Sequence, residues 1–268
     1  MKTTPHTLRQ LLSLLGLLVC YSSLSLHAEN DPLVSVDLAI LMLEQQNQPK
    51  YNAPFSTEVN AQSHSEDAER YKRWVRTSSN PDNFQQVVAD ENLLSLPFAY
   101  HGPRQFTLYE RVNQPGEKTT FIPRERLLLP SNSTSGVLVL TRDQRTSESS
   151  PFKIGFIDCS EADQNSMGVL FCNYSDAPKA VRIGKNSSPI TINPSARSWT
   201  PLHQDRAVTP LKIASFDGQW KLVQNTVVRL SPHRPTLGVI LPGDQDSSKS
   251  IRLLRFTLPN WKSTTPNA

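Results

Sequence analysis

The sequence is poor in the residue types that carry most protein chemistry. Its 268 residues include 3 cysteines, 3 methionines and 6 histidines. The histidines beyond residue 28 lie at least 30 positions apart, so no local metal-binding motif is present. The chain has no Cys-x-x-Cys pair, Gly-x-Ser-x-Gly elbow, calcium loop or glycine-rich phosphate loop. We therefore expect no catalytic residues, no metal, blue copper included, and no cofactor.

Long hydrophobic runs are also missing. The longest, Leu11 to Cys20, is about half of the roughly 20 apolar residues that a membrane span requires. Basic residues precede it and small, polar residues follow it to Ala28, the arrangement of a secretory signal. We predict that residues 1–28 are removed, with cleavage after Ala28 or at an earlier serine. The mature protein would then be exported to the periplasm, cell envelope or extracellular space, with no membrane span.

Cys20 closes the apolar run, as the lipidated cysteine of a bacterial lipoprotein does. The residue before it is Val19, whereas that processing favours a small residue. This argues against a lipid anchor.

Only two cysteines remain after removal of the signal, Cys159 and Cys172. In an oxidising compartment, two cysteines most simply form one disulfide. Each lies in or next to an apolar run, so the pair would join the two strands of a hairpin. The alternative is two buried thiols that pack as small hydrophobic groups.

The mature chain has 26 basic and 24 acidic residues, a formal charge of +2. Residues 29–140 carry 10 basic and 14 acidic residues, whereas residues 141–268 carry 16 and 10. This asymmetry would favour an anionic partner for the C-terminal half, or attraction between the halves. Because the basic residues are scattered through apparent strands, we expect no nucleic-acid partner.

The distribution of prolines and short apolar runs predicts an all-β fold. The sequence has 21 prolines, which leave little room for long helices. Between them lie short segments with period-2 alternation, separated by turn residues. Asp217-Gly218 is the clearest hairpin signal, because both residues accept positive φ. Many short strands at this spacing favour an antiparallel β-sandwich. One short helix is expected at Phe84–Ala89, after Asn80-Pro-Asp82.

A polar segment around residues 142–151 suggests a linker between two small β units. The predicted organisation is a signal peptide, an N-terminal unit at 29–146 with a polar loop at 47–70, a C-terminal unit at 147–262 and a loose tail at 263–268. The alternative is a single sandwich with a long hairpin near residue 146.

Several segments of the C-terminal half share a pattern in which strands end at Asn, Gly or Pro. They are Leu170-Phe-Cys-Asn-Tyr-Ser, Val181-Arg-Ile-Gly, Ile190-Thr-Ile-Asn-Pro-Ser and Trp220-Lys-Leu-Val. With Tyr100-His-Gly-Pro and Leu127-Leu-Leu-Pro upstream, they resemble a group of uncharacterised exported bacterial β-rich proteins. The resemblance implies a β scaffold over residues 95–258 and no particular activity.

Three functional hypotheses remain. The first is a non-enzymatic interaction or structural protein of the cell envelope, whose partner is an envelope protein or cell-wall glycan. The second is a carbohydrate-binding module that uses an exposed aromatic residue, for which Trp199 and Arg197 near a turn are the candidates, while Trp220 is expected in the core. The third is a hydrolase that gathers His203, Asp205 and a serine from distant parts of the chain.

Overall fold

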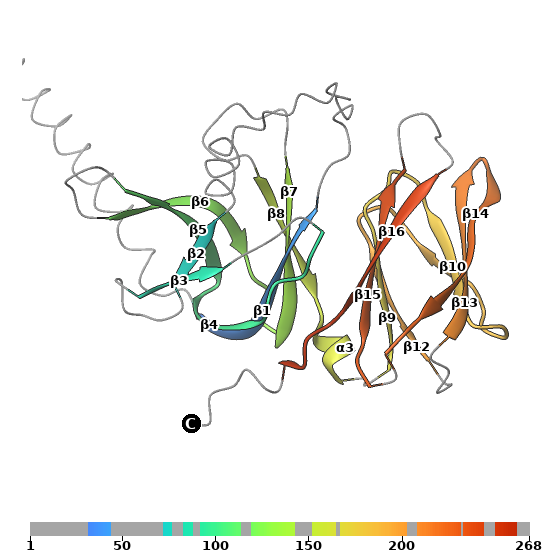
Figure 1. Ribbon diagram of the computed structural model, residues 1–268, viewed down its shortest axis with the longest axis horizontal. Helices are drawn as coiled ribbons and strands as arrows, with labels where there is room; N and C mark the ends of the chain where they lie inside the picture. The colour runs from blue at the N-terminus through green and yellow to red at the C-terminus, as the bar shows by residue number, and fades with distance from the viewer. Residues whose placement is uncertain are drawn as a thin grey trace, which may run out of the picture.

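The computed structural model describes residues 32–43, 72–76, 83–87, 92–113, 119–142, 152–164, 167–202, 208–231, 233–243 and 250–261. Over these residues the protein is all-β, as predicted, with sixteen strands and one short helix, α3 (Ser160–Gln164) (Figure 1). The predicted signal peptide 1–28 with Cys20, the polar loop 47–70 and the tail 263–268 lie outside the described residues. Among the described helices, none is long and apolar enough to cross a membrane.

The strands form four sheets of four strands each. Sheet A has the order β4 (Phe98–Pro103), β1 (Leu33–Leu43), β7 (Ser135–Arg142), β8 (Phe152–Asp158). Sheet B has the order β3 (Phe84–Val87), β2 (Arg73–Arg76), β5 (Gln105–Val112), β6 (Thr120–Leu128). Sheet C has the order β12 (Arg197–Pro201), β9 (Gly168–Asn173), β15 (Thr236–Pro242), β16 (Ile251–Thr257). Sheet D has the order β11 (Ile190–Ile192), β10 (Lys179–Ile183), β13 (Val208–Asp217), β14 (Gln219–Arg229).

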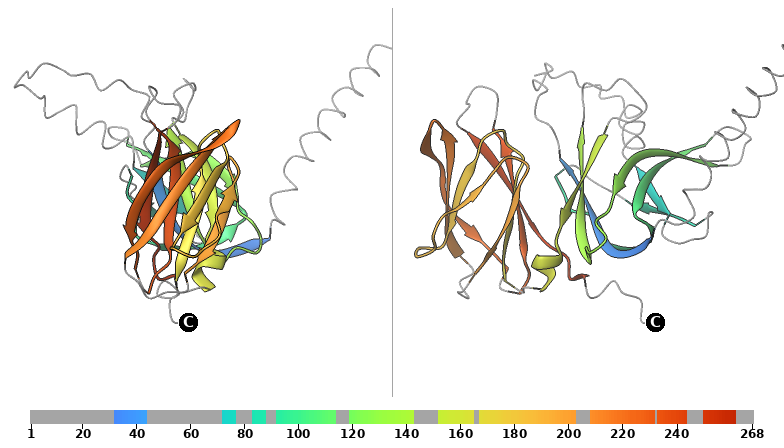
Figure 2. Two further views of the ribbon diagram at one scale, coloured as in Figure 1. Left: turned by 90° about the vertical axis from the view of Figure 1, so that its right-hand side faces the viewer. Right: turned by 180° about the vertical axis from the view of Figure 1, so that it is seen from behind.

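The four sheets stack as layers in the order B, A, C, D (Figures 1 and 2). Three hydrophobic cores separate them. One core lies between sheets A and B, a second between A and C, and a third between C and D. Most of each central strand of sheets A and C is therefore covered on both faces, whereas the edge strand β4 of sheet A has one exposed face and sheets B and D each have an outer face.

This layering explains the continuous apolar runs in the sequence. All described residues of β9 are buried, and only the last residue of β15 is exposed. Strands buried on both faces lose the polar alternation of a half-exposed strand. β1 and β7 pair in parallel at the centre of sheet A, as β9 and β15 do in sheet C.

The two halves of the chain repeat one topology. Replacing β1 to β8 by β9 to β16, in order, converts sheet A into C and sheet B into D. The sense of pairing is also the same, including the parallel pair at the centre. In the parallel pairs, Leu38 lies opposite Gly136 and Val169 lies opposite Thr236, so Leu38 and Val169 are equivalent positions. Three residues further along each strand, Leu41 is then equivalent to Cys172. Both lie in the core between A and C, so equivalent faces meet there as in an isologous dimer.

The predicted division near residue 146 falls inside sheet A. Although the prediction assigned β8 to the C-terminal unit, β8 pairs with β7 from Gly136↔Asp158 to Arg142↔Phe152. The change from sheets A and B to sheets C and D comes between β8 and β9.

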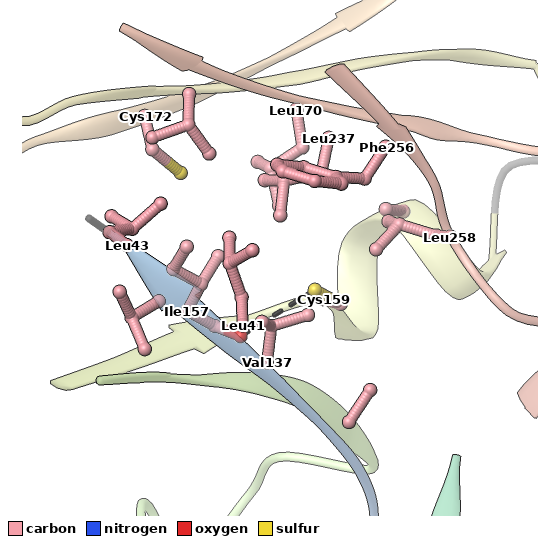
Figure 3. Packing of buried hydrophobic residues seen from close by; sticks show 14 of the residues in the cluster. Leu41, Leu43, Val137, Ile157, Cys159, Leu170, Cys172, Leu237, Phe256 and Leu258 are labelled. Atoms are coloured by element: carbon pink, nitrogen blue, oxygen red, sulfur yellow. Dashed lines mark hydrogen bonds between the residues drawn. The ribbon is translucent and has the colours of Figure 1, made fainter. Parts of the chain in front are cut away.

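Two local predictions are wrong. The expected helix at Phe84–Ala89 is a strand over Phe84–Val87, because these residues pair with β2 and direct Val87 into the core. The expected disulfide is also absent, since Cys159 and Cys172 are free and buried. They do not share a hairpin. Instead, β8 and β9 belong to facing sheets, and Figure 3 shows the two side chains apart in the core between A and C.

Candidate functional site

The residues proposed from sequence for ligand contact lie on β12 and serve the contact between the halves. Trp199 is half-buried and packs against the core between A and C. Its ring covers Gly168, where an added Cβ would lie 2.3 Å from a ring atom. The Trp199 ring is therefore largely committed to packing.

Arg197 joins the two halves electrostatically. Its Nη2 donates to Asp158 Oδ2 at 2.9 Å, which ties β12 of sheet C to the end of β8 of sheet A. Burial raises the pKa of the Asp158 carboxyl, but hydrogen bonds from Ser160 and the Arg197 charge outweigh it, so the pKa lies below its ordinary value. The Arg197 guanidinium thus already holds a carboxylate.

The outer face of sheet D carries an open depression of about 370 Å³. Its floor is made by Ala180 and Ala214, which lie directly opposite each other on β10 and β13. Trp220 and Leu222 of β14 form one side, and the other side is formed by Pro189 and Thr191. Two small residues between taller neighbours produce the hollow. We call this feature the sheet D groove.

Trp220 is exposed, contrary to the prediction that it fills the core. Its side chain is 48% exposed, and its ring lies 5.2 Å from that of Phe216 across the hairpin. The hairpin itself is confirmed, with Gly218 at a φ of +69° between Asp217 and Gln219. A bulge between Ile213 and Ala214 shifts the register here. The alternation of β14 could not reveal which of its two faces meets the core.

One end of the sheet D groove is cationic. Arg182 and Lys212 lie directly opposite each other on neighbouring strands and both line the groove. Like charges in this position repel each other. Among the described residues, no carboxylate forms an ion pair with either side chain, and none lines the groove.

The outer face of sheet B holds the equivalent positions of the first half. A bulge between Thr107 and Tyr109 occupies the same place in the β5–β6 pair as the bulge in β13–β14. This aligns Trp74↔Tyr109 of sheet B with Ala180↔Ala214 of sheet D.

In sheet B those positions are filled by aromatic rings. Phe84 and Phe121 stack with centroids 3.9 Å apart, and Tyr109 meets Phe84 edge-on at 5.0 Å. Trp74 is only 7% exposed and meets Phe121 at 6.1 Å. The same scaffold is thus self-filled in the first half and open in the second.

The described residues offer little chemistry for catalysis. No group of three or more His, Cys, Asp or Glu side chains within the described ranges could hold a metal. Ser35 Oγ lies 2.7 Å from His101 Nδ1, but this pair is on an exposed strand surface, whereas a serine nucleophile needs a sheltered site with oxyanion donors. His203 and Asp205 lie outside the described residues.

Comparison with known proteins adds no functional information. No protein-family model matches the chain, and no curated protein resembles it closely enough to count as a relative.

Proposed function

We propose that this protein is a non-enzymatic, exported binding protein of the cell envelope, and that it holds a carbohydrate chain in the sheet D groove. The observation that carries the proposal is the exposed Trp220 ring beside an open floor of alanines. Export rests on the N-terminal sequence, with its basic residues, short apolar run and small-residue end at Ala28.

The groove has the physical features that a sugar ring requires. The apolar C–H face of a sugar packs well on an indole, which combines a large apolar area with low conformational entropy. The paired strands β10, β13 and β14 hold the groove residues in fixed positions, so little entropy is lost when a ligand binds. The groove is open rather than enclosed, which suits a chain that continues beyond the contacting residues.

Solution binding tests the proposal. The mature chain would be titrated calorimetrically with soluble fragments of cell-wall glycan from its native cells, so that the signal does not depend on any one tryptophan. Of the four tryptophans, Trp220 is the one exposed residue. Trp220→Ala should weaken binding by about thirtyfold or more, since truncation of a central aromatic contact costs about 2 kcal/mol or more of binding free energy.

Val227→Ala is the matched control. Val227 lies on the same strand and is 63% exposed, but it does not line the groove. The Val227→Ala protein should bind the glycan fragments with the affinity of the unaltered protein. If Trp220→Ala and Val227→Ala bind equally well, the glycan does not use the groove and the proposal fails.

A further inference from the structure

The equivalent arginines of the two halves have different surroundings. Arg76 of β2 aligns with Arg182 of β10 when Trp74 is aligned with Ala180. The Arg76 guanidinium lies over the rings of Phe84 at 5.4 Å and Tyr109 at 5.8 Å. Such cation–π contacts compensate a cation that has left water.

Within the described ranges, no aromatic ring lies over the Arg182 guanidinium in this way. The positions equivalent to Phe84 and Tyr109 are Pro189 and Ala214, so the space beside Arg182 that aromatic rings fill in sheet B is open in sheet D. A group the size of a six-membered ring is what this scaffold accommodates at that position in sheet B.

Sheet D also has a second cation at the groove that sheet B lacks. Lys212 aligns with Thr107, so the position opposite the equivalent arginine carries an uncharged side chain in the first half. A neutral ring could cover one cation, whereas a negative charge between Arg182 and Lys212 would also offset their mutual repulsion. A carboxylate on the ring would reach both side chains from the groove and would accept charge-assisted hydrogen bonds.

We therefore propose that the sheet D groove selects an acidic sugar, a uronate whose ring lies over Ala180 and Ala214 against Trp220 and whose carboxylate binds Arg182 and Lys212. This inference rests on the proposed function and adds the chemical class of the ligand. It also agrees with the excess of basic residues in the C-terminal half of the chain.

The test compares acidic hexasaccharides with their own neutral forms. The mature protein would be titrated calorimetrically with oligomers of galacturonate, mannuronate, guluronate and the glucuronate-containing repeat of hyaluronate. Each would be paired with its carboxyl-reduced form, which keeps the ring stereochemistry and loses the charge. At least one acid should bind about tenfold more tightly than its reduced form, the scale of a charge-assisted hydrogen bond. This preference should shrink as salt is added.

Two variants locate the preference. Arg182→Gln and Lys212→Gln each keep a polar side chain on the outer face and should reduce the acid preference to threefold or less, estimated as about half of the tenfold effect in free energy. Val227→Ala should retain it. Circular dichroism would verify that each variant is folded.

The outcomes separate the two proposals. Binding of acidic and reduced oligomers with equal affinity, or an acid preference that survives both glutamine variants, would overturn the acidic-sugar inference and leave carbohydrate binding standing. If neither the oligomers nor native cell-wall fragments bind, both proposals fail.

Discussion

The core between sheets A and C predicts that the two halves of the chain unfold together. Leu41 of β1 is fully buried in this core and belongs to the first half, while its neighbours across the core belong to sheet C (Figure 3). Leu41→Ala removes three carbon atoms, each worth about 0.8 kcal/mol of transfer free energy, and leaves a cavity between two packed sheets. Together these effects should lower the free energy of unfolding by about 3 to 5 kcal/mol.

The assay is urea unfolding combined with amide hydrogen exchange. The substitution should move a single unfolding transition to lower urea. Amide protection should fall in sheet D as well as in sheets A and B, because layers that unfold as one cooperative unit all lose the stability that the contact between A and C provides. Leu96→Ala is the matched control. Leu96 is 87% exposed, so this substitution should change stability by less than about 0.5 kcal/mol. Unchanged amide protection in β10 and β13 of the Leu41→Ala protein would show that the halves are energetically independent, contrary to this prediction.

Three further predictions concern buried groups. Glu125→Gln should lower the free energy of unfolding by about 3 to 5 kcal/mol, because it removes the charge of the buried carboxylate that accepts hydrogen bonds from Arg73 Nε and Nη2 at 3.0 Å, while the Arg73 cation stays buried. The double variant Arg73→Met, Glu125→Leu should have a urea midpoint much closer to that of the unaltered protein. A loss of stability equal to the sum of the losses in the two single variants would contradict this. Burial raises the pKa of the Cys172 thiol to about 12 and also raises that of Cys159, so neither should react with iodoacetamide at pH 8 until urea unfolds the protein. A mass deficit of two hydrogens in the intact protein would instead indicate a disulfide. Burial, with a smaller effect from Tyr109, raises the pKa of Tyr100 to about 12 from an ordinary value of 10.0. The phenol ionises at lower pH in the unfolded chain than in the folded protein, so the free energy of unfolding should fall as the pH rises from about 10 towards 12. Tyr100→Phe should reduce that fall. An identical alkaline stability profile for the variant would contradict the prediction.

Much of the fold was predictable because strands have a recognisable sequence signal, a short apolar or alternating segment bounded by turn residues. The Asp217-Gly218 hairpin and the apolar runs of β1, β7, β9 and β15 correspond to observed elements. β2 and β12 have no comparable sequence signal, since each is short and carries arginine at its start. One of these arginines, Arg73, is buried beside Glu125, a partner 52 positions away that no local pattern indicates.

The candidate site was predictable only in kind. An exposed aromatic residue was expected, but Trp199 was chosen for its position near a turn, whereas the exposed ring belongs to Trp220. The floor of the groove consists of two alanines, which carry no chemical signal of their own. The role of these alanines becomes visible only by comparison with the first half, where Trp74 and Tyr109 occupy the equivalent positions. That comparison depends on topology and strand register, because the two halves do not share the same residues at these positions.

The most direct test of the account is nuclear magnetic resonance of the mature, isotope-labelled protein during titration with soluble cell-wall glycan fragments. If the glycan lies in the sheet D groove, saturable shifts should appear at the Trp220 indole N–H and at the amides of Ala180 and Ala214, while the Trp199 indole signal stays in place. Shifts centred on Trp199, or no shifts at all at saturating glycan, would contradict it.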